Sequence, residues 1–483
     1  MIGIHSVQQI RAAEVEFESR NPDISLMQRA ALKVAERAMQ MAPKGTILVA
    51  VGPGNNGGDG LYAVRELMKM GRHVLVWQVT DKAHPGGVIA ARQLGARFMN
   101  TLAVMRQLPE ISLVIDAVVG LGSHRGLSEE MIIFAEEVRT LSIPVLAVDI
   151  PSGLDPDSHL APEHAVHANW TVVFSAPQLC HLAQPAASYC GDVEIIDLGC
   201  ELPDTDIQQM QRVDVARWWP WPTQYADKYS RGGLGIDTGS DRYPGAAILS
   251  VTGAVFSGAG ILRFSGPPSC ADMVVRRQPS VTIGRGRVQA WLVGCGWGDG
   301  PENEHRLDHV LEAGIPAVVD AEALVHIPAA LPEGWLMTPH AGELATIMGV
   351  KRAEVVADPI RHAREAAKRW KTTVLLKGAT QYIAEENGRV TLAIPGPAWT
   401  AQAGSGDVLA GICGTLMAAG LPAWKAASMG ASVQAMAATH RPGPYPPERQ
   451  AEVIPEVLAH LAGVIGDQAI LAGNLTPNSI AVA

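Results

Sequence analysis

The sequence predicts an α/β protein of two domains, each built on a mostly parallel sheet flanked by helices. In both halves of the chain, short apolar runs typical of buried strands alternate with glycine-rich turns and with segments of helical periodicity. The length of 483 residues exceeds that of one ordinary domain. The composition, 47% hydrophobic and 18% charged, is that of a globular protein with sizeable cores.

The expected division gives a first domain at residues 1–212, a connector at 213–229, a second domain at 230–465 and a tail at 466–483. The connector is predicted from the clustered Trp and Pro residues at 218–222 and the small residues that follow them. Such a composition suits a chain segment that packs over a surface rather than one that forms its own core.

In the first domain, apolar residues at helical spacing predict an amphipathic helix over residues 26–38. The apolar run 47–51 then predicts a strand, which the sequence GPGNNGGDG at 52–60 follows directly. Glycines let the backbone approach a ligand closely, and the free amides at the start of the next helix favour an anion. This turn is therefore a candidate binding site, although glycine-rich turns also occur as plain connectors.

Two further apolar runs end in polar residues, in LVIDAVVGLGSHRG at 113–126 and VLAVDIPSGLD at 145–155. Because the carboxyl ends of parallel strands meet at one edge of a sheet, the side chains after these strands should share a crevice. We expect one pocket lined by Asp59, Asp116, Asp149 and Ser152.

In the second domain, strands are expected at 246–251, 290–293, 317–319 and 374–376. The richest stretch is AQAGSGDVLAGICGTLMAAG at 401–420, where Gly404, Ser405 and Gly406 form a bare turn before a helix of small and apolar residues. The amides of this turn would collect the negative charge of a phosphoryl group, and Asp407 could accept a hydroxyl proton. Asp407 could also serve only as a carboxylate that satisfies the helix dipole.

The motifs NNGGDG, DAVVGLGSHRG and VDIPSG together resemble the epimerase domain of the NAD(P)HX repair family, which inverts the C6 hydroxyl of hydrated nicotinamide dinucleotides. The resemblance implies a Rossmann-like domain in which Asn56, Asp116 and Ser152 hold a potassium ion and Asp149 is the catalytic base. It also implies that the hydrated dinucleotide contacts Asn55, Asn56, Gly57, Gly58, Asp59, Gly120, Leu121, Gly122, Ser123, His124, Arg125, Gly126 and Asp149. The alternative for Asp149 is a helix cap, and Gln178 stands where relatives usually carry a Lys.

In the second half, TPHAGEL at 338–344, LLKGATQYI at 375–383 and GSGDVLAG at 404–411 occur in the order found in the ADP- or ATP-dependent NAD(P)HX dehydratase domain, a ribokinase-like fold. The resemblance implies Asp407 as catalytic base and Mg²⁺ as cofactor. It places the substrate on Ala246, Gly296, His340 and Asp407, and the adenine nucleotide on Lys377, Gly378, Ala379, Thr380, Gln381 and Gly406. His340 could instead be a buried, hydrogen-bonded histidine, and Glu322 and Pro397 depart from the family pattern.

The resemblance implies a bifunctional repair enzyme that epimerises R- and S-NAD(P)HX and dehydrates the S form to NAD(P)H at the expense of ADP or ATP. The choice of nucleotide and the preference between NADHX and NADPHX stay open. The alternative is a ribokinase-like small-molecule kinase joined to a non-catalytic ligand-binding domain, because folds of this kind host several functions.

Charge and hydropathy limit the partners. The net charge is −10 and Lys and Arg are scattered, which argues against nucleic acid. The N-terminus lacks the features of a signal peptide, and no apolar run reaches the ~20 residues of a membrane span. We therefore expect a cytoplasmic protein without a membrane partner, and a homo-oligomer.

Overall fold

The computed structural model describes residues 1–120 and 126–471. Contacts divide these residues into two compact units, one of Gly3–Thr205 and one of Met1–Ile2 with the chain from Asp206 onward. The division falls a few residues before the boundary expected after residue 212, because β9 (Ile207–Gln209) pairs with β18 (Val390–Leu392) in the second sheet.

The first unit is a doubly wound parallel sheet. Within its described residues the strand order is β4-β3-β2-β5-β6-β7-β8, and every pair is parallel. The chain thus runs outward in one direction from β2 and then in the other from β5, so the two strands flank a switch point. The strands are β2 (Thr46–Val51), β3 (His73–Gln78), β4 (Arg97–Met99), β5 (Ile111–Ala117), β6 (Val145–Val148), β7 (Trp170–Phe174) and β8 (Asp192–Ile196).

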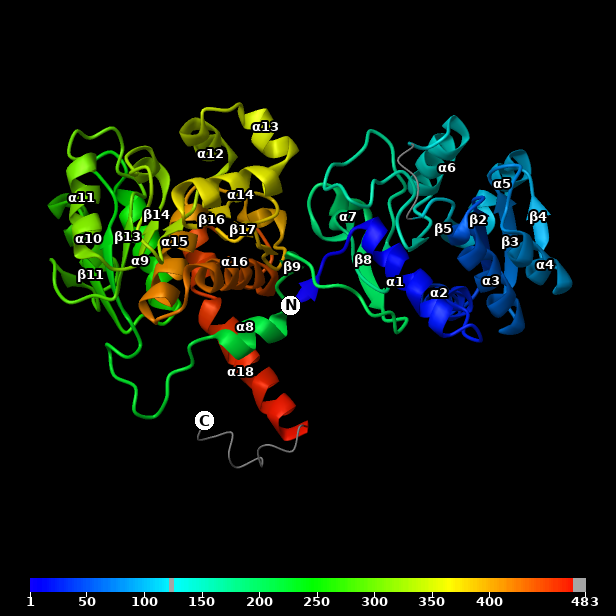
Figure 1. Ribbon diagram of the computed structural model, residues 1–483, viewed down its shortest axis with the longest axis horizontal. Helices are drawn as coiled ribbons and strands as arrows, with labels where there is room; N and C mark the ends of the chain where they lie inside the picture. Colours follow the sequence, from blue (N-terminus) through cyan, green and yellow to red (C-terminus); the bar gives the residue numbers. More distant parts are fainter. Residues whose placement is uncertain (121–125, 472–483) are drawn as a thin grey trace. The chain divides into compact units, whose positions relative to one another are not determined.

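Helices cover both faces of this sheet, which explains why its strands are apolar throughout. Along β2, Ile47 and Val49 pack into the core under α2 and α3, whereas Leu48 and Ala50 pack into the core under α5 and α6. Figure 1 shows α2 and α3 along one side of the strands and α5 and α6 along the other. The helices are α1 (Val7–Arg20), α2 (Leu26–Met41), α3 (Asn55–Lys69), α4 (Pro85–Gln93), α5 (Thr101–Gln107), α6 (Glu129–Thr140) and α7 (Leu179–Leu182), with 3-10 turns η1 (Leu108–Glu110) and η2 (Ala186–Tyr189).

The second unit also has a largely parallel sheet, with strand order β1-β9-β18-β17-β16-β15-β14-β13-β10-β11-β12 among the described residues. In this order of the described strands, the seven from β16 to the edge strand β12 are parallel to one another. β17 pairs antiparallel with both of its neighbours. Its other strands are β1 (Ile2–Gly3), β10 (Gly233–Asp237), β11 (Ile261–Phe264), β12 (Thr282–Ile283), β13 (Ala290–Val293), β14 (Ala317–Val319), β15 (Leu336–Met337), β16 (Thr373–Leu376) and β17 (Tyr382–Ala384).

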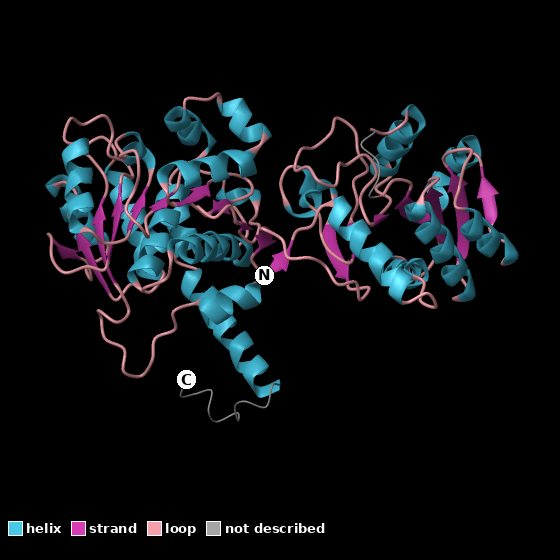
Figure 2. Cartoon of the chain, viewed as in Figure 1, coloured by secondary structure: helices cyan, strands magenta, loops and turns pink. Residues whose placement is uncertain are grey.

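Helices lie on both faces of this sheet as well (Figure 2). On one face, Leu292 of β13 packs into a core shared with α9, α15 and α16; on the other, Trp291 contacts His309 of α11. The helices are α8 (Arg212–Trp218), α9 (Pro244–Phe256), α10 (Pro268–Arg277), α11 (Asn303–Ala313), α12 (Ala341–Met348), α13 (Arg352–Ala357), α14 (Pro359–Trp370), α15 (Ser405–Ala418), α16 (Ala423–His440), α17 (Pro447–Ala451) and α18 (Ile454–Leu471), with 3-10 turns η3 (Ala321–Val325) and η4 (Ala398–Thr400). The predicted fold class is confirmed.

One predicted strand is wrong. Residues 246–251 belong to α9, which begins with Pro244 at its first position, and the strand of this region is β10. The apolar run is explained by close packing on α15, because a Cβ on Gly253 would lie 2.2 Å from the carbonyl oxygen of Val408, and one on Gly411 would lie 2.1 Å from that of Ser250. The sequence of a buried helix can be apolar throughout, and periodicity alone does not distinguish such a helix from a buried strand.

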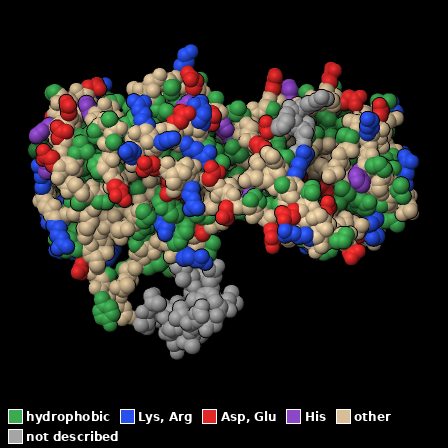
Figure 3. All heavy atoms as spheres, viewed as in Figure 1, with side chains coloured by type: hydrophobic (Ala, Val, Ile, Leu, Met, Phe, Trp, Pro, Cys, Tyr) green, Lys and Arg blue, Asp and Glu red, His purple; other side chains and the backbone are tan. Residues whose placement is uncertain are grey.

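Surface chemistry agrees with the composition. The face in Figure 3 carries Lys and Arg interspersed with Asp and Glu. None of the helices within residues 1–120 and 126–471 combines the length and hydrophobicity needed to cross a membrane.

Candidate functional sites

The switch point of the first unit gathers the three residues expected to hold potassium. Asn56 stands in the first turn of α3, Asp116 in β5, and Ser152 after β6. The Ser152 hydroxyl donates to Asp116 Oδ1 at 2.6 Å and its amide to Oδ2 at 2.7 Å. The Asn56 amide donates to the carbonyl oxygen of Val119 at 2.9 Å, and the Val119 amide donates to Ser152 Oγ at 3.1 Å.

This network leaves oxygen atoms that suit a hard cation. Asn56 Oδ1 is buried and lacks a hydrogen-bond partner in the described structure. Asp116 is 2% exposed and forms no ion pair with any described residue. Burial raises the pKa of its carboxyl, while hydrogen bonds from Ser152 and Val118 oppose that rise. A buried carboxylate needs a counter-charge, and carboxylate, amide and hydroxyl oxygens are ligands for such ions. The residues therefore fit a potassium ion.

Asp149 follows β6 in a strained backbone conformation. Its φ is +68°, a left-handed value that costs a residue with a side chain about 1–2 kcal/mol. The conformation is held from both sides, because the Asp149 amide donates to the carbonyl oxygen of Val172 at 2.8 Å and its carbonyl oxygen lies 2.8 Å from His181 Nε2. Among the described residues 150–169 no helix begins, so Asp149 is not a helix cap.

His181 is fixed as a neutral donor. Burial lowers its pKa to about 4, and its Nδ1 accepts from the Gln178 amide at 3.1 Å, which leaves the proton on Nε2 facing Asp149. Gln178, the departure from the family pattern, is fully buried, and its side chain donates to the carbonyl oxygen of Ala176 at 3.1 Å. This side chain therefore helps to build the turn that supports Asp149.

A cavity of about 670 Å³ opens at these strand ends. Of the residues expected to contact the dinucleotide, the cavity is lined by Asn55, Asn56, Asp59, Gly120 and Asp149. Gly57 and Gly58 are buried beneath it; a Cβ on Gly57 would lie 2.1 Å from the carbonyl oxygen of Gly52, so the turn requires glycine there. Gly126 is exposed and does not line the cavity, and Leu121, Gly122, Ser123, His124 and Arg125 lie outside the described residues.

Sequence reasoning missed the helical wall of this cavity. It is formed by residues of α1 and α2, namely Arg11, Glu14, Val15, Glu18, Leu26, Met27 and Ala30. No helix was predicted from the sequence over the residues of α1, and the helical spacing of Arg11, Glu14 and Glu18 is more typical of a solvated face.

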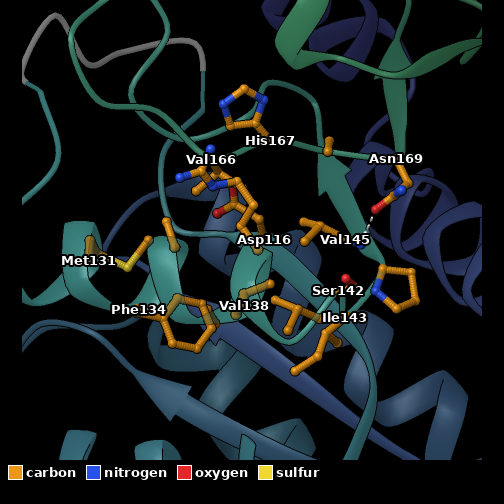
Figure 4. Close-up of a pocket in the computed structure, with 16 residues that line it drawn as sticks. Asp116, Met131, Phe134, Val138, Ser142, Ile143, Val145, Val166, His167 and Asn169 are labelled. Atoms are coloured by element: carbon orange, nitrogen blue, oxygen red, sulfur yellow. Dashed lines mark hydrogen bonds between the residues drawn. The ribbon is translucent and has the colours of Figure 1, made fainter.

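A second cavity, of about 320 Å³, lies between the sheet and α6 (Figure 4). Its lining is mostly apolar and includes Met131, Phe134 and Val138. It reaches Asp116 from the α6 side, whereas the larger cavity reaches Asn56 and Asp149. The two cavities share no lining residue, and the larger one is lined by five of the expected dinucleotide contacts.

In the second unit, β10 and β13 flank the corresponding switch point. Ala246 lies in the first turn of α9 and Gly296 in the turn after β13, and the two are in contact because a Cβ on Gly296 would lie 2.4 Å from that of Ala246. Glu322, a departure from the family pattern, accepts from the Trp297 amide at 3.2 Å. The longer side chain thus supports the same turn. Pro397, the other departure, caps the short turn η4.

Lys377 supplies a positive charge at this site and pairs with two carboxylates. Its Nζ lies 2.5 Å from Asp320 Oδ1 and 3.9 Å from Glu343 Oε2. The two carboxylates outweigh the effect of burial and raise the pKa of Lys377, so the ammonium stays charged. A Cβ on Gly406 would lie 3.3 Å from the same Nζ, which places the bare turn before α15 beside the positive charge.

The other expected nucleotide contacts follow Lys377 between β16 and β17. Gly378 and Ala379 are exposed, whereas Thr380 and Gln381 are half-buried. Gln381 Oε1 is a buried acceptor without a partner in the described structure. His340 is exposed and caps α12, its Nδ1 accepting from the amides of Gly342 and Glu343 at 3.0 Å. The alternative of a buried histidine is wrong.

Asp407 stands in the first turn of α15. Burial, and next the neighbouring Asp320, raise its pKa to about 7, while Lys377 opposes the rise. A carboxylate with such a pKa exchanges protons at neutral pH, as a general base must. Sequence reasoning did not single out Asp320 or Glu343, whose carboxylates pair with Lys377, although Glu343 lies within TPHAGEL.

Comparisons with known proteins identify the family of each half of the chain. Residues 23–180 match the family model described as YjeF-related protein N-terminus, and residues 234–452 match the model described as NAD(P)H-hydrate dehydratase. Among solved structures, the ADP/ATP-dependent NAD(P)H-hydrate dehydratase from Bacillus subtilis, co-crystallized with ATP and Mg²⁺, is 25% identical with a TM-score of 0.50. The match covers 53% of this chain and 100% of that one.

Two curated relatives align with nearly the whole chain. The bifunctional NAD(P)H-hydrate repair enzyme Nnr of Mycobacterium leprae is 37% identical over 454 residues, which are 90% of this chain and 93% of the relative. The enzyme of the same name from Mycobacterium tuberculosis is 36% identical over 443 residues, which are 88% and 91% of the two chains. The chain therefore belongs to the family of bifunctional NAD(P)H-hydrate repair enzymes.

Proposed function

We propose that this chain repairs hydrated nicotinamide dinucleotides: the first unit interconverts R- and S-NAD(P)HX, and the second dehydrates the S form to NAD(P)H with ADP or ATP. The observation that carries the proposal is that one chain holds two strand-end sites, each with a carboxylate placed for proton transfer. Asp149 lines the cavity of about 670 Å³, and Asp407 stands at the start of a helix near the Lys377 ammonium.

For epimerisation, Asp149 removes the proton of the C6 hydroxyl. Its backbone is fixed by Val172 and His181, so the carboxylate does not have to be ordered when the substrate binds. The Asn56 amide, the Asp116 carboxylate and the Ser152 hydroxyl would hold a potassium ion, which supplies positive charge beside the dinucleotide when it is bound. The turn 52–60 presents amides and Asn55 to the substrate.

For dehydration, Asp407 accepts the C6 hydroxyl proton, and that oxygen attacks the terminal phosphoryl group of the nucleotide. The bond between C6 and this oxygen then breaks, with phosphate as a much better leaving group than hydroxide. C5 loses a proton to solvent, and the electron pair of that C–H bond forms the C5–C6 double bond of the dihydronicotinamide ring. The Lys377 ammonium and the amides at the start of α15 stabilise the charge on the transferred group. Gly378, Ala379, Thr380, Gln381 and Gly406 hold the nucleotide, and Ala246, Gly296 and His340 hold the hydrated dinucleotide.

Magnesium fits this second site through few protein ligands. Among the described residues no group of three or more His, Cys, Asp or Glu is arranged to hold a metal ion. Mg²⁺ commonly takes one or two carboxylates together with nucleotide phosphates, and Asp320 and Glu343 supply such carboxylates near Lys377. The ion would offset the charge of the phosphates when bound.

We also propose that the chain acts in the cytoplasm as a homo-oligomer, without a nucleic-acid partner. The interspersed surface charges and the net charge of −10 support the last point. The functional domains are proposed at residues 1–212 and 230–465, with the connector at 213–229 and the tail at 466–483.

The test is to incubate the purified chain with R-NADHX alone, Mg²⁺ and ADP or ATP, and to follow R-NADHX, S-NADHX and NADH by chromatography. We expect NADH to form through S-NADHX faster than spontaneous epimerisation allows. Asp149→Asn should block the conversion of R to S and leave the dehydration of added S intact, and Asp407→Asn should do the reverse. A stable phosphorylated product without NADH would instead identify a small-molecule kinase.

A further inference from the structure

The larger cavity of the first unit concentrates acidic side chains. The described residues that line it include the carboxylates of Asp59 and Asp149 and those of Glu14 and Glu18, and among these lining residues Arg11 is the one cation. Four carboxylates so near one another cannot all stay ionised at low energetic cost, because like charges in a partly shielded site repel. At least one of them is expected to hold a proton.

Asp59 is the group that holds it. It is half-buried near the start of α3, on the cavity wall that also carries Asn55 and Asn56. Its carboxyl makes no hydrogen bond or ion pair with any described residue, so none of these residues stabilises its charge. Among the described residues, the ionisable groups that face this region are Arg11, Glu14 and Glu18 of α1, His84 at the start of α4, and Asp149 after β6.

The electrostatics support this assignment. Burial, then the charges of Asp149 and Glu14, raise the pKa of Asp59 well above its usual range. Burial and the neighbouring carboxylates thus favour the protonated form of Asp59. Two carboxyl groups in one pocket, one holding a proton and one without, form the arrangement that enzymes use for paired acid and base roles.

We propose that Asp59 is the proton donor that works opposite Asp149 in epimerisation, an inference that rests on the proposed function of this site. Asp149 takes the proton of the C6 hydroxyl as a C6 carbonyl forms and the bond between C6 and the ring nitrogen N1 breaks. The electron pair moves to N1, which takes the proton of Asp59. After rotation about the C5–C6 bond, N1 attacks the other face of the carbonyl, Asp59 recovers its proton and Asp149 returns one to the oxygen. No other reactant is consumed.

Asp59→Asn is the direct test, because an amide has nearly the shape of a protonated carboxyl but transfers no proton. With R-NADHX as substrate, we expect kcat for epimerisation to fall by about a hundredfold or more, with KM within about threefold of the wild-type value. Asp59→Glu, which keeps an acid, should restore part of the rate. In the wild type, epimerisation should decline as pH rises and Asp59 loses its proton, and Asp59→Asn should lack that decline.

Glu16→Gln is the matched control, since it removes a carboxylate of α1 that pairs with Arg20 and does not line the cavity, and it should keep kcat within about threefold. Circular dichroism must show that every variant is folded. An Asp59→Asn variant that epimerises at the wild-type rate, or one that loses only substrate affinity, would overturn the donor role and leave the proposed function standing. A wild-type chain that does not epimerise R-NADHX would refute the proposed function itself.

Discussion

The environment of Asp407 predicts how dehydration depends on pH. Burial and the neighbouring Asp320 raise its pKa from 3.8 to about 7. Because Asp407 must be ionised to accept a proton, about a tenth of the molecules are competent near pH 6 and about nine tenths near pH 8. We therefore expect kcat/KM for S-NADHX, at saturating nucleotide, to rise about tenfold over this interval.

The assay measures initial rates of NADH formation from purified S-NADHX between about pH 5.5 and pH 8.5, with rates without enzyme subtracted at each pH. Asp407→Asn is the control, because its residual rate should lack the rise that belongs to Asp407 ionisation. A wild-type profile that is flat or falls over the interval from pH 6 to pH 8 would refute the assignment of Asp407 as the base.

The raised pKa of Asp407 also predicts that its carboxylate lowers the free energy of unfolding at neutral and higher pH. Because the pKa is raised on folding, the folded chain holds a proton that the unfolded chain has released between about pH 4 and pH 7, so the free energy of unfolding falls as pH rises through this window. A pKa raised from 3.8 to about 7 corresponds to about 4 kcal/mol. Asp407→Asn should therefore be more stable than the wild type by up to about this amount near pH 8 and by little near pH 4. Equal stability in denaturant near pH 8 would contradict the argument.

Three further outcomes are expected. His181→Ala should lower kcat for epimerisation at least about tenfold, because the backbone of Asp149 loses a hydrogen bond; a rate equal to wild type in the same chromatographic assay would show that His181 does not position Asp149. Lys377→Met should lower the free energy of unfolding by about 3–5 kcal/mol, since the buried carboxyl of Asp320, 2% exposed, loses its partner in the ion pair; denaturant titration checks this, and an unchanged midpoint would count against it. Exchange of K⁺ for Na⁺ should slow epimerisation and spare dehydration, so equal epimerisation rates in the two salts would argue against a potassium site at Asn56.

The strand-end motifs predicted the shared edge of the sheet, but the single pocket lined by Asp59, Asp116, Asp149 and Ser152 is wrong. Asp59 and Asp149 line the larger cavity, Asp116 lines the smaller one, and Ser152 is fully buried with its hydroxyl on Asp116. Sheet geometry brings the strand ends together, whereas the side-chain packing that divides the space between them has no local signal in the sequence. The bare turn before Asp407 predicted the start of α15, because glycine followed by small residues is typical of a helix that approaches a ligand or another helix closely.

Features that depend on distant contacts could not be predicted. The left-handed backbone of Asp149 is maintained by Val172 and His181, and no local pattern signals a non-glycine residue in that conformation. The contribution of α1 to the cavity was missed because Arg11 and Glu14 look like an ordinary solvated face until tertiary packing places them. The pKa of Asp407 was beyond sequence reasoning for the same reason, since it depends on Asp320 and Lys377.

The central claim is that one chain clears both hydrated epimers. The most direct measurement adds the purified chain, Mg²⁺ and ADP or ATP to a mixture of R- and S-NADHX and follows the near-ultraviolet absorbance of NADH, with controls that lack the nucleotide. We predict nucleotide-dependent recovery of nearly all the NADH, faster than spontaneous epimerisation permits. Recovery that stops at the S fraction would contradict the epimerase role of the first unit, and no recovery with either nucleotide would contradict the account as a whole.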